Sequence, residues 1–259
     1  MTKADIQLVR ALTDKRGRTE HGLFIAEGEK LIGELRASAL RVRKIYTLEG
    51  VFEGPEVEVV APRDMERISQ LKTPSNSVAL VEIPRYRLKP EELRRQLTLV
   101  LDEVQNPGNL GTIIRLADWF GIRDIVCSEG SADCFNPKVV QATMGAILRV
   151  RVHYTPLAPL LSGAARAGIP VYGTFLEGEN IYDTDLSPTG IIVMGNEGRG
   201  VTPEVAQCVT RKLFIPPWPA DRRGSESLNV AMATGIVCAE FRRRSTATTP
   251  AAAPAGRQK

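Results

Sequence analysis

Three loops of this chain combine glycine or proline with polar side chains, the composition of loops that contact ligands. The first is LDEVQNPGNLGTIIR at 101–115, and the second is IIVMGNEGRGV at 191–201. The third begins with FIPPW at 214–218 and ends with SLNVAMATG at 227–235. Glycine lets a backbone approach a ligand closely, and Asn and Ser are common helix caps. A capped turn explains each loop equally well when it is taken alone, so only their combination can indicate a function.

Five side chains in these loops are candidates for chemistry. Asn109 is placed to cap the helix that follows it, and Arg115 lies near the N-terminal end of that helix. Glu197 stands out because the rest of its loop is suited to backbone contacts. Ser227 is a suitable N-cap for the last helix, which puts Asn229 in the first turn.

Several common classes of site are excluded by spacing. The second loop has the pattern GxxGxG, whereas a dinucleotide-binding loop needs GxGxxG, and no acidic residue follows an early strand at the required distance. No Gly-Lys-Ser/Thr of a phosphate-binding loop and no GxSxG of a hydrolase is present. His21 and His153 both lie outside the three loops. A Rossmann-type oxidoreductase and a hydrolase are therefore disfavoured.

Cysteine and hydrophobic patterns predict a cytoplasmic protein without a metal site. None of the four cysteines forms a CxxC pair or lies near a histidine, so we expect reduced, buried thiols. No apolar run reaches the roughly 18 residues of a membrane span, and Met1 to Arg10 lacks a signal-peptide core.

The net charge of +4 is only a weak indication of a polyanionic partner, but the basic residues are clustered. Two clusters precede residue 90, and two more follow residue 220: Lys15, Arg16 and Arg18; Arg85, Arg87 and Lys89; Arg222 and Arg223; Arg242 to Arg244.

The first third of the chain has the pattern of a small α/β unit. IPRYRLKP at 83–90 then resembles a linker, and the Pro/Ala-rich stretch 245–259 is expected to be disordered. The expected helices are 6–12, 29–40 and 63–71, and the expected strands are 42–48, 57–60 and 78–83.

The rest of the chain alternates strands and helices. Such alternation predicts a mostly parallel sheet covered on both faces, with ligands bound at the carboxyl ends of its strands. The expected strands are 97–101, 124–127, 170–174, 190–194 and 212–215, and the expected helices are 110–120, 137–148, 157–167, 201–208 and 229–244.

In this order, the three loops resemble the motifs of the SpoU (TrmH) family in the SPOUT superfamily of RNA methyltransferases. Asn109 and Arg115 match its first motif, Asn196 to Gly200 its second, and Ser227 to Val230 its third. The resemblance covers about 97–244. There are departures: Gly108 stands where a histidine is frequent, 219–223 adds a basic stretch, and AMATG replaces the frequent SVAAG.

The resemblance implies a fold and an assembly. The catalytic domain, 97–244, is expected to carry a C-terminal trefoil knot and to work as a homodimer whose active site is completed across the interface. Residues 1–83 resemble the family's RNA substrate-binding domain, which is similar to the ribosomal-protein L30e fold. Residues 84–96 are then a linker, and 245–259 a disordered tail.

The resemblance also implies a reaction, transfer of a methyl group from S-adenosylmethionine to a ribose 2′-hydroxyl of RNA, with ribosomal RNA favoured over transfer RNA. Arg115 is expected to ease off the hydroxyl proton or to stabilise the developing alkoxide, and no metal is needed. Asn109, Glu197, Ser227 and Asn229 would position the reactants. The residues implied for the methyl donor are Met194, Gly195, Asn196, Gly198, Ile215, Leu228 and Asn229, and those for RNA are Lys15, Arg16, Arg18, Arg85, Arg87 and Lys89.

One alternative from a different class remains open. A non-catalytic RNA-binding relative could keep the same fold, but it would be expected to lose Arg115 or the donor loops, and this chain retains both.

Overall fold

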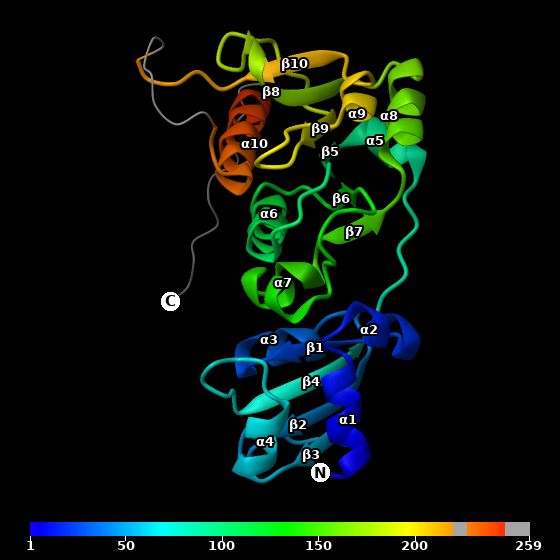
Figure 1. The fold of residues 1–259 in the computed structure, drawn as a ribbon, viewed down its shortest axis with the longest axis vertical. Helices are drawn as coiled ribbons and strands as arrows, with labels where there is room; N and C mark the ends of the chain where they lie inside the picture. Colours follow the sequence, from blue (N-terminus) through cyan, green and yellow to red (C-terminus); the bar gives the residue numbers. More distant parts are fainter. Residues whose placement is uncertain (220–226, 247–259) are drawn as a thin grey trace.

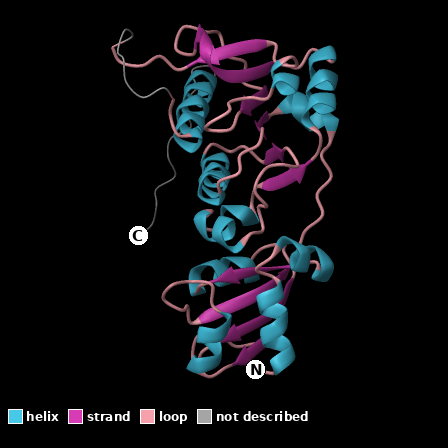
Figure 2. Ribbon diagram, viewed as in Figure 1, coloured by secondary structure: helices cyan, strands magenta, loops and turns pink. Residues whose placement is uncertain are grey.

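The computed structural model describes residues 1–219 and 227–246, which form two α/β domains stacked along the long axis of the molecule (Figure 1, Figure 2). The N-terminal domain has a mixed four-stranded sheet in the order β1-β4-β2-β3, in which β4 is antiparallel to β1 and β2, and β3 is parallel to β2. Its elements are α1 (Lys3–Ala11), α2 (Lys15–His21), β1 (Leu23–Glu27), α3 (Glu29–Arg36), β2 (Val42–Thr47), β3 (Val57–Val59), α4 (Pro62–Ile68) and β4 (Ser77–Glu82).

Two elements of this domain were not expected from the sequence. Helix α2 consists of polar and charged residues without an apolar stripe, so its sequence has no helical periodicity. Strand β1 follows it after one residue, Gly22, whose φ of 64° ends the helix in the left-handed conformation that glycine favours. With a single residue between them, the two elements give no loop signal that would separate them.

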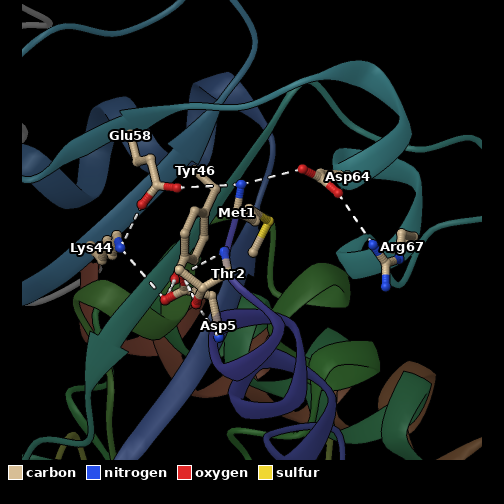
Figure 3. Close-up of polar contacts among 8 residues, drawn as sticks. All are labelled: Met1, Thr2, Asp5, Lys44, Tyr46, Glu58, Asp64 and Arg67. Carbon is tan, nitrogen blue, oxygen red and sulfur yellow. Dashed lines mark hydrogen bonds and ion pairs between the residues drawn. The ribbon is translucent and has the colours of Figure 1, made fainter.

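A polar network joins helices α1 and α4 of this domain to strands β2 and β3 of its sheet (Figure 3). Asp5 of α1 accepts a hydrogen bond from the Tyr46 hydroxyl at 2.9 Å and lies 3.6 Å from the Lys44 ammonium. The hydrogen bond from the Thr2 hydroxyl is the main reason that the pKa of Asp5 falls to about 2. The eight residues of the network are Met1, Thr2, Asp5, Lys44, Tyr46, Glu58, Asp64 and Arg67. It lies at the end of the molecule away from the second domain, so we assign it a structural role.

The C-terminal domain has a six-stranded sheet in the order β10-β8-β9-β5-β6-β7, in which every neighbouring pair is parallel. The predicted parallel sheet is thus confirmed. Its strands are β5 (Leu97–Leu101), β6 (Asp124–Cys127), β7 (Arg151–Tyr154), β8 (Val171–Asn180), β9 (Gly190–Met194) and β10 (Arg211–Phe214). Its helices are α5 (Pro90–Arg95), α6 (Pro107–Trp119), α7 (Pro137–Ala142), the 3-10 helix η1 (Ala146–Leu148), α8 (Leu157–Arg166), α9 (Pro203–Ala206) and α10 (Val230–Thr246).

Helices cover both faces of this sheet, as expected. Successive residues of β5 alternate between two apolar cores: Leu99 and Leu101 pack with α6, α7 and α10, whereas Val100 packs with α5, α8 and α9. Successive side chains of a strand point to opposite faces, and both faces of this sheet are buried. The sequences of its central strands are therefore unbroken apolar runs. The knot implied by the resemblance and the L30e-like character of the first domain remain predictions.

Several boundaries differ from those predicted. The expected helix 137–148 is broken at Met144 and Gly145, which have φ values of 51° and 90°, so that α7 and η1 are separate. Strand β7 was missed, and α5 lies within the expected linker 84–96. Ser245 and Thr246, expected in the disordered tail, lie in α10. The rest of that tail, and Arg222 and Arg223, lie outside the described residues.

The two domains share one apolar core. Phe24 of β1 contacts Phe135, which precedes α7, with ring centroids 4.8 Å apart, and Ile32 and Leu35 of α3 belong to the same cluster as the core of α6 and α7. The sequence suggested two separate units joined by a linker. In the structure, buried apolar side chains of both domains pack together where the domains meet.

Candidate active site

The three loops singled out in the sequence meet at the carboxyl ends of parallel strands. Strands β5 and β9 are neighbours and lead into the first and second loops, and β10 leads into the third. Helix α10, which follows the third loop, packs against α6, which follows the first. The sheet and these helices therefore bring together residues that are 88 and 120 positions apart in the chain.

Asn109 connects all three loops. Its side-chain amide donates a hydrogen bond to Oε1 of Glu197 in the second loop, and its Oδ1 accepts one from Nδ2 of Asn229 in the third at 3.0 Å. The expectation that Asn109 caps α6 is wrong, because Oδ1 of Asn106 accepts from the amides of Gly108 and Asn109 instead. The Asn109 side chain is thereby free for the contacts between loops.

Asn229, and not Ser227 as expected, caps α10. Its Oδ1 accepts hydrogen bonds from the amides of Ala231 and Met232 at 3.0 and 3.3 Å, while its Nδ2 binds Asn109. Ser227 is exposed, two residues earlier, and makes no hydrogen bond to the described residues. A primary amide both accepts and donates, so Asn229 can cap the helix and contact the first loop simultaneously, which a serine at this position could not reach to do.

Asn196 shapes the second loop from within. Its Oδ1 accepts from the amides of Gly198 and Arg199, and its Nδ2 donates to the backbone carbonyl of Glu103 at 2.8 Å. Glu103 adds an ion pair to Arg199 at 3.0 Å and has a positive φ of 54°, which is uncommon for a residue other than glycine. Sequence reasoning missed Glu103, because nothing in its type distinguishes it from an ordinary surface carboxylate.

The glycines of the second loop have different roles. A Cβ on Gly195 would lie 2.3 Å from the carbonyl carbon of Gly200, so the fold of the loop requires glycine there. A Cβ on Gly198 would meet only Oδ1 of Asn196, at 3.6 Å, so that face of the loop is open. Met194 is buried at the end of β9, and Ile215 is partly buried against the core.

Arg115 is exposed on α6 and makes no hydrogen bond or ion pair within residues 1–219 and 227–246. The structure therefore does not join it by a hydrogen bond or ion pair to Glu197, Asn109 or Asn229 of the same chain. It shares the exposed face of α6 with Trp119, one turn further on, whose side chain is 78% exposed.

The residues expected to bind RNA have different environments. Lys15 and Arg16 are exposed in α2, and Arg85, Arg87 and Lys89 are exposed in the connection between the domains. Arg18, in contrast, is only 2% exposed, so its placement on an RNA-binding surface is wrong. Its guanidinium pairs with Asp133 of the other domain at 2.5 Å and donates to the carbonyls of Leu12 and Thr13, since a buried charge needs partners.

Within the described part of the chain, no cluster of three or more His, Cys, Asp or Glu side chains is arranged to hold a metal ion. None of the helices described is both long and apolar enough to cross a membrane.

Comparison with known proteins places the chain in a family. The model of the SpoU rRNA Methylase family matches residues 96–239, and that of the MRM3-like substrate binding domain matches residues 3–79. A relative, 23S rRNA (guanosine(2553)-2′-O)-methyltransferase RlmP of Bacillus subtilis, is 29% identical over 90% of this chain and 94% of its own length.

Solved structures agree with this assignment. A TrmH-family protein from Porphyromonas gingivalis is 40% identical with a TM-score of 0.85, over 94% of this chain and 99% of that one. The AdoMet-bound rRNA methyltransferase from Sinorhizobium meliloti is 30% identical with a TM-score of 0.83, over 94% of this chain and 96% of that one. Fold and loop cluster together define an RNA methyltransferase. The chain belongs to the SpoU rRNA methylase family, which favours the catalytic interpretation over the non-catalytic alternative.

Proposed function

We propose that this protein transfers a methyl group from S-adenosylmethionine to a ribose 2′-hydroxyl of RNA, with ribosomal RNA as the favoured substrate. The observation that carries the proposal is the hydrogen-bonded chain Glu197–Asn109–Asn229, which ties the three family motifs into one site. The named relative from Bacillus subtilis is a 2′-O-methyltransferase of 23S rRNA. An RNA substrate also favours the cytoplasm as the location.

The loops after β9 and β10 suit the methyl donor. Gly198 leaves its face of the second loop open, and Leu228 exposes both an apolar side chain and a backbone amide that has no hydrogen bond to the described residues. Exposed backbone groups can read the edge of an adenine, and an apolar side chain can pack on its face. Met194, Gly195, Asn196, Ile215 and Asn229 would complete this pocket. When bound, the donor supplies a sulfonium-activated methyl group.

Arg115 is proposed to act at the 2′-oxygen across a dimer interface. Among the described residues of one chain it makes no hydrogen bond or ion pair to Asn109, Glu197 or Asn229. It lies on a face that also exposes Trp119, and Met232 is 65% exposed on the adjacent helix α10. Large exposed apolar side chains on neighbouring helices are typical of a protein–protein contact. We propose that two copies pair through this face, so that Arg115 of one protomer reaches the loops of its partner.

The first domain is proposed to bind the RNA substrate. The match to the MRM3-like substrate binding domain supports this role, and Lys15, Arg16, Arg85, Arg87 and Lys89 supply exposed positive charge along it and its connection. Phosphate contacts of such residues account for much of RNA-binding affinity.

Mapping of 2′-O-methyl sites in RNA from cells with and without the protein tests this function. We expect one or a few ribosomal positions to lose the ribose methyl group in its absence, and purified protein to restore it with S-adenosylmethionine in the presence of a chelator. Methylation of a base, or dependence on a metal ion, would contradict the proposal.

A further inference from the structure

Arg149 connects the first domain to α6, the helix that carries Arg115. It lies between η1 and β7, and its Nε is 3.0 Å from both carboxylate oxygens of Asp118 in α6. Its Nη1 is 3.1 Å from Oε2 of Glu34 in α3, a helix of the first domain. Asp118 follows Arg115 by three residues, so this ion pair holds the same segment of α6 that carries the proposed catalytic arginine.

Close packing surrounds this connection. Gly145 has a φ of 90°, which glycine favours, and it lies beside the carboxylate of Glu34: a Cβ there would be 2.8 Å from Oε2, the end of that side chain. A Cβ on Gly111 would lie 2.4 Å from the Cβ of Ala142, so α7 is in equally close contact with α6. The segment 137–149 therefore touches the first domain on one side and α6 on the other.

The first domain is also held against this segment away from Arg149. The ion pair of the buried Arg18 with the partly buried Asp133 and the ring contact between Phe24 and Phe135 join the domains next to α7. Packed interiors transmit small displacements because they have little free space to absorb them. A change in the position of the first domain relative to residues 137–149 is thus expected to shift α6.

We propose that Arg149 is a positioning residue. It couples the position that the first domain takes when it binds RNA to the orientation of α6 and of Arg115. The first domain then contributes to the methyl-transfer step in addition to RNA affinity. This inference rests on the proposed function.

The pairs of Arg149 are partly exposed, which makes the proposal testable without unfolding the protein. The Arg149 side chain is 49% exposed, and exposed ion pairs contribute little to folding stability. The hydrogen bonds that Arg149 donates to Asp118 are the main cause that raises the pKa of Arg149, so it remains charged at any working pH. Its planar guanidinium is needed to grip two carboxylates, which a lysine cannot reproduce.

The experiment compares full-length variants. Glu34→Gln removes the charge of the first-domain partner. Arg149→Lys keeps the positive charge but loses the planar guanidinium, which can bind two carboxylates at once. The matched control is Arg36→Lys, because Arg36 lies on the same helix as Glu34 and pairs with Glu56 at 3.0 Å within the first domain only. We expect Glu34→Gln and Arg149→Lys to lower kcat by about 10-fold, with the RNA KM and the donor Kd within about twofold of wild type, since small misplacements of reacting groups are costly. The control should behave as wild type.

A second readout does not depend on methylation. Hydrogen exchange of the amides of α6 should be faster in Glu34→Gln and Arg149→Lys than in Arg36→Lys. A raised RNA KM with unchanged kcat, or unchanged exchange in α6, would overturn the inference. If no RNA is methylated even by the wild type, the proposed function fails, and the exchange measurement still decides the coupling.

Discussion

Nδ2 of Asn229 donates to Oδ1 of Asn109, 120 residues earlier in the chain, at 3.0 Å, while Oδ1 of Asn229 caps α10. A single side chain thus fixes the start of one helix and the position of the side chain that contacts Glu197. The geometry of the proposed site and the local stability of α10 therefore meet at one residue, and substitutions can separate them.

Asn229→Asp is predicted to inactivate the enzyme without destabilising it. The carboxylate keeps an oxygen that caps α10, and a negative charge at a helix N-terminus is favourable, but the donor to Asn109 is lost. We expect the free energy of unfolding to stay within about 0.5 kcal/mol of wild type, and kcat to fall by about 100-fold. Asn229→Ala is the comparison, because it should lose activity and also about 1 kcal/mol of stability. Normal turnover by Asn229→Asp would show that this hydrogen bond is not needed.

Arg115→Ala is predicted to abolish methyl transfer while folding and donor binding remain. Arg115 is exposed and has no hydrogen-bond or ion-pair partner among the described residues, so removing its side chain breaks no such bond there. Single-turnover transfer, circular dichroism and donor titration would measure the three properties. Near-normal turnover would remove Arg115 from the proposed chemistry.

How far the sequence predicted this structure differs among elements. Strands β5, β6 and β9 have the expected boundaries because they lie in the middle of the sheet, where both faces are apolar and the sequence forms an unbroken run. Strand β7 is at the edge, and its sequence RVHY mixes charged, apolar and partly polar side chains, so no apolar run marks it.

The candidate site was predictable in residue type but less so in geometry. Asn109, Glu197 and Asn229 were all expected, yet the two caps were assigned to the wrong residues, because Asn and Ser are nearly equivalent as caps in sequence. Glu103 was missed because its partners Asn196 and Arg199 lie in the second loop, more than 90 residues further along the chain. Arg149 was missed because its partners lie on α6 and on α3 of the first domain. Arg18 was misplaced for the same reason, since its partner Asp133 lies in the other domain.

Mixed dimers are predicted to recover activity if the site is shared between two chains. A protomer with Arg115→Ala retains intact loops, and one with Asn229→Asp retains Arg115. When the two are co-expressed with different tags and the mixed dimer is purified, one of its two sites has both intact loops and an intact arginine. We expect about half the activity of wild type per dimer. A mixed dimer as inactive as either parent would place Arg115 in its own chain's site. Trp119→Glu should prevent pairing, as measured by light scattering.

Substitution of the exposed basic residues is predicted to weaken RNA binding alone. The double variant Lys15→Gln, Arg16→Gln should raise the RNA KM by about 10-fold at low salt and less at high salt, because each lost phosphate contact lowers the salt dependence of binding. Donor affinity should not change. Arg18→Gln is the matched comparison on the same helix: it should destabilise the protein, since it leaves Asp133 without its partner. Equal effects of the two variants on KM would contradict the structural assignment of Arg18.

Acid sensitivity is predicted to depend on Asp124, which is buried at the start of β6. Its carboxylate accepts hydrogen bonds from Gln96 and Arg151, and its Oδ1 is 2.8 Å from Nε2 of His153. Burial raises the pKa of Asp124, but the hydrogen bonds with His153 and Arg151 outweigh it and hold the pKa at about 2, against an ordinary value of 3.8.

A carboxylate with a lowered pKa stabilises the folded state above its unfolded pKa, and this contribution is lost as the pH falls toward the folded pKa. The free energy of unfolding of wild type should therefore exceed that of Asp124→Asn by a constant amount above about pH 4, and the difference should shrink by about 2 kcal/mol as the pH falls from about 4 to about 2. Urea denaturation across this range measures it. Glu179→Gln is the control, because Glu179 pairs with Arg211 at the surface and its loss should alter the pH profile little. A difference between wild type and Asp124→Asn that stays constant down to about pH 2 would show that the ionised carboxylate does not stabilise the fold.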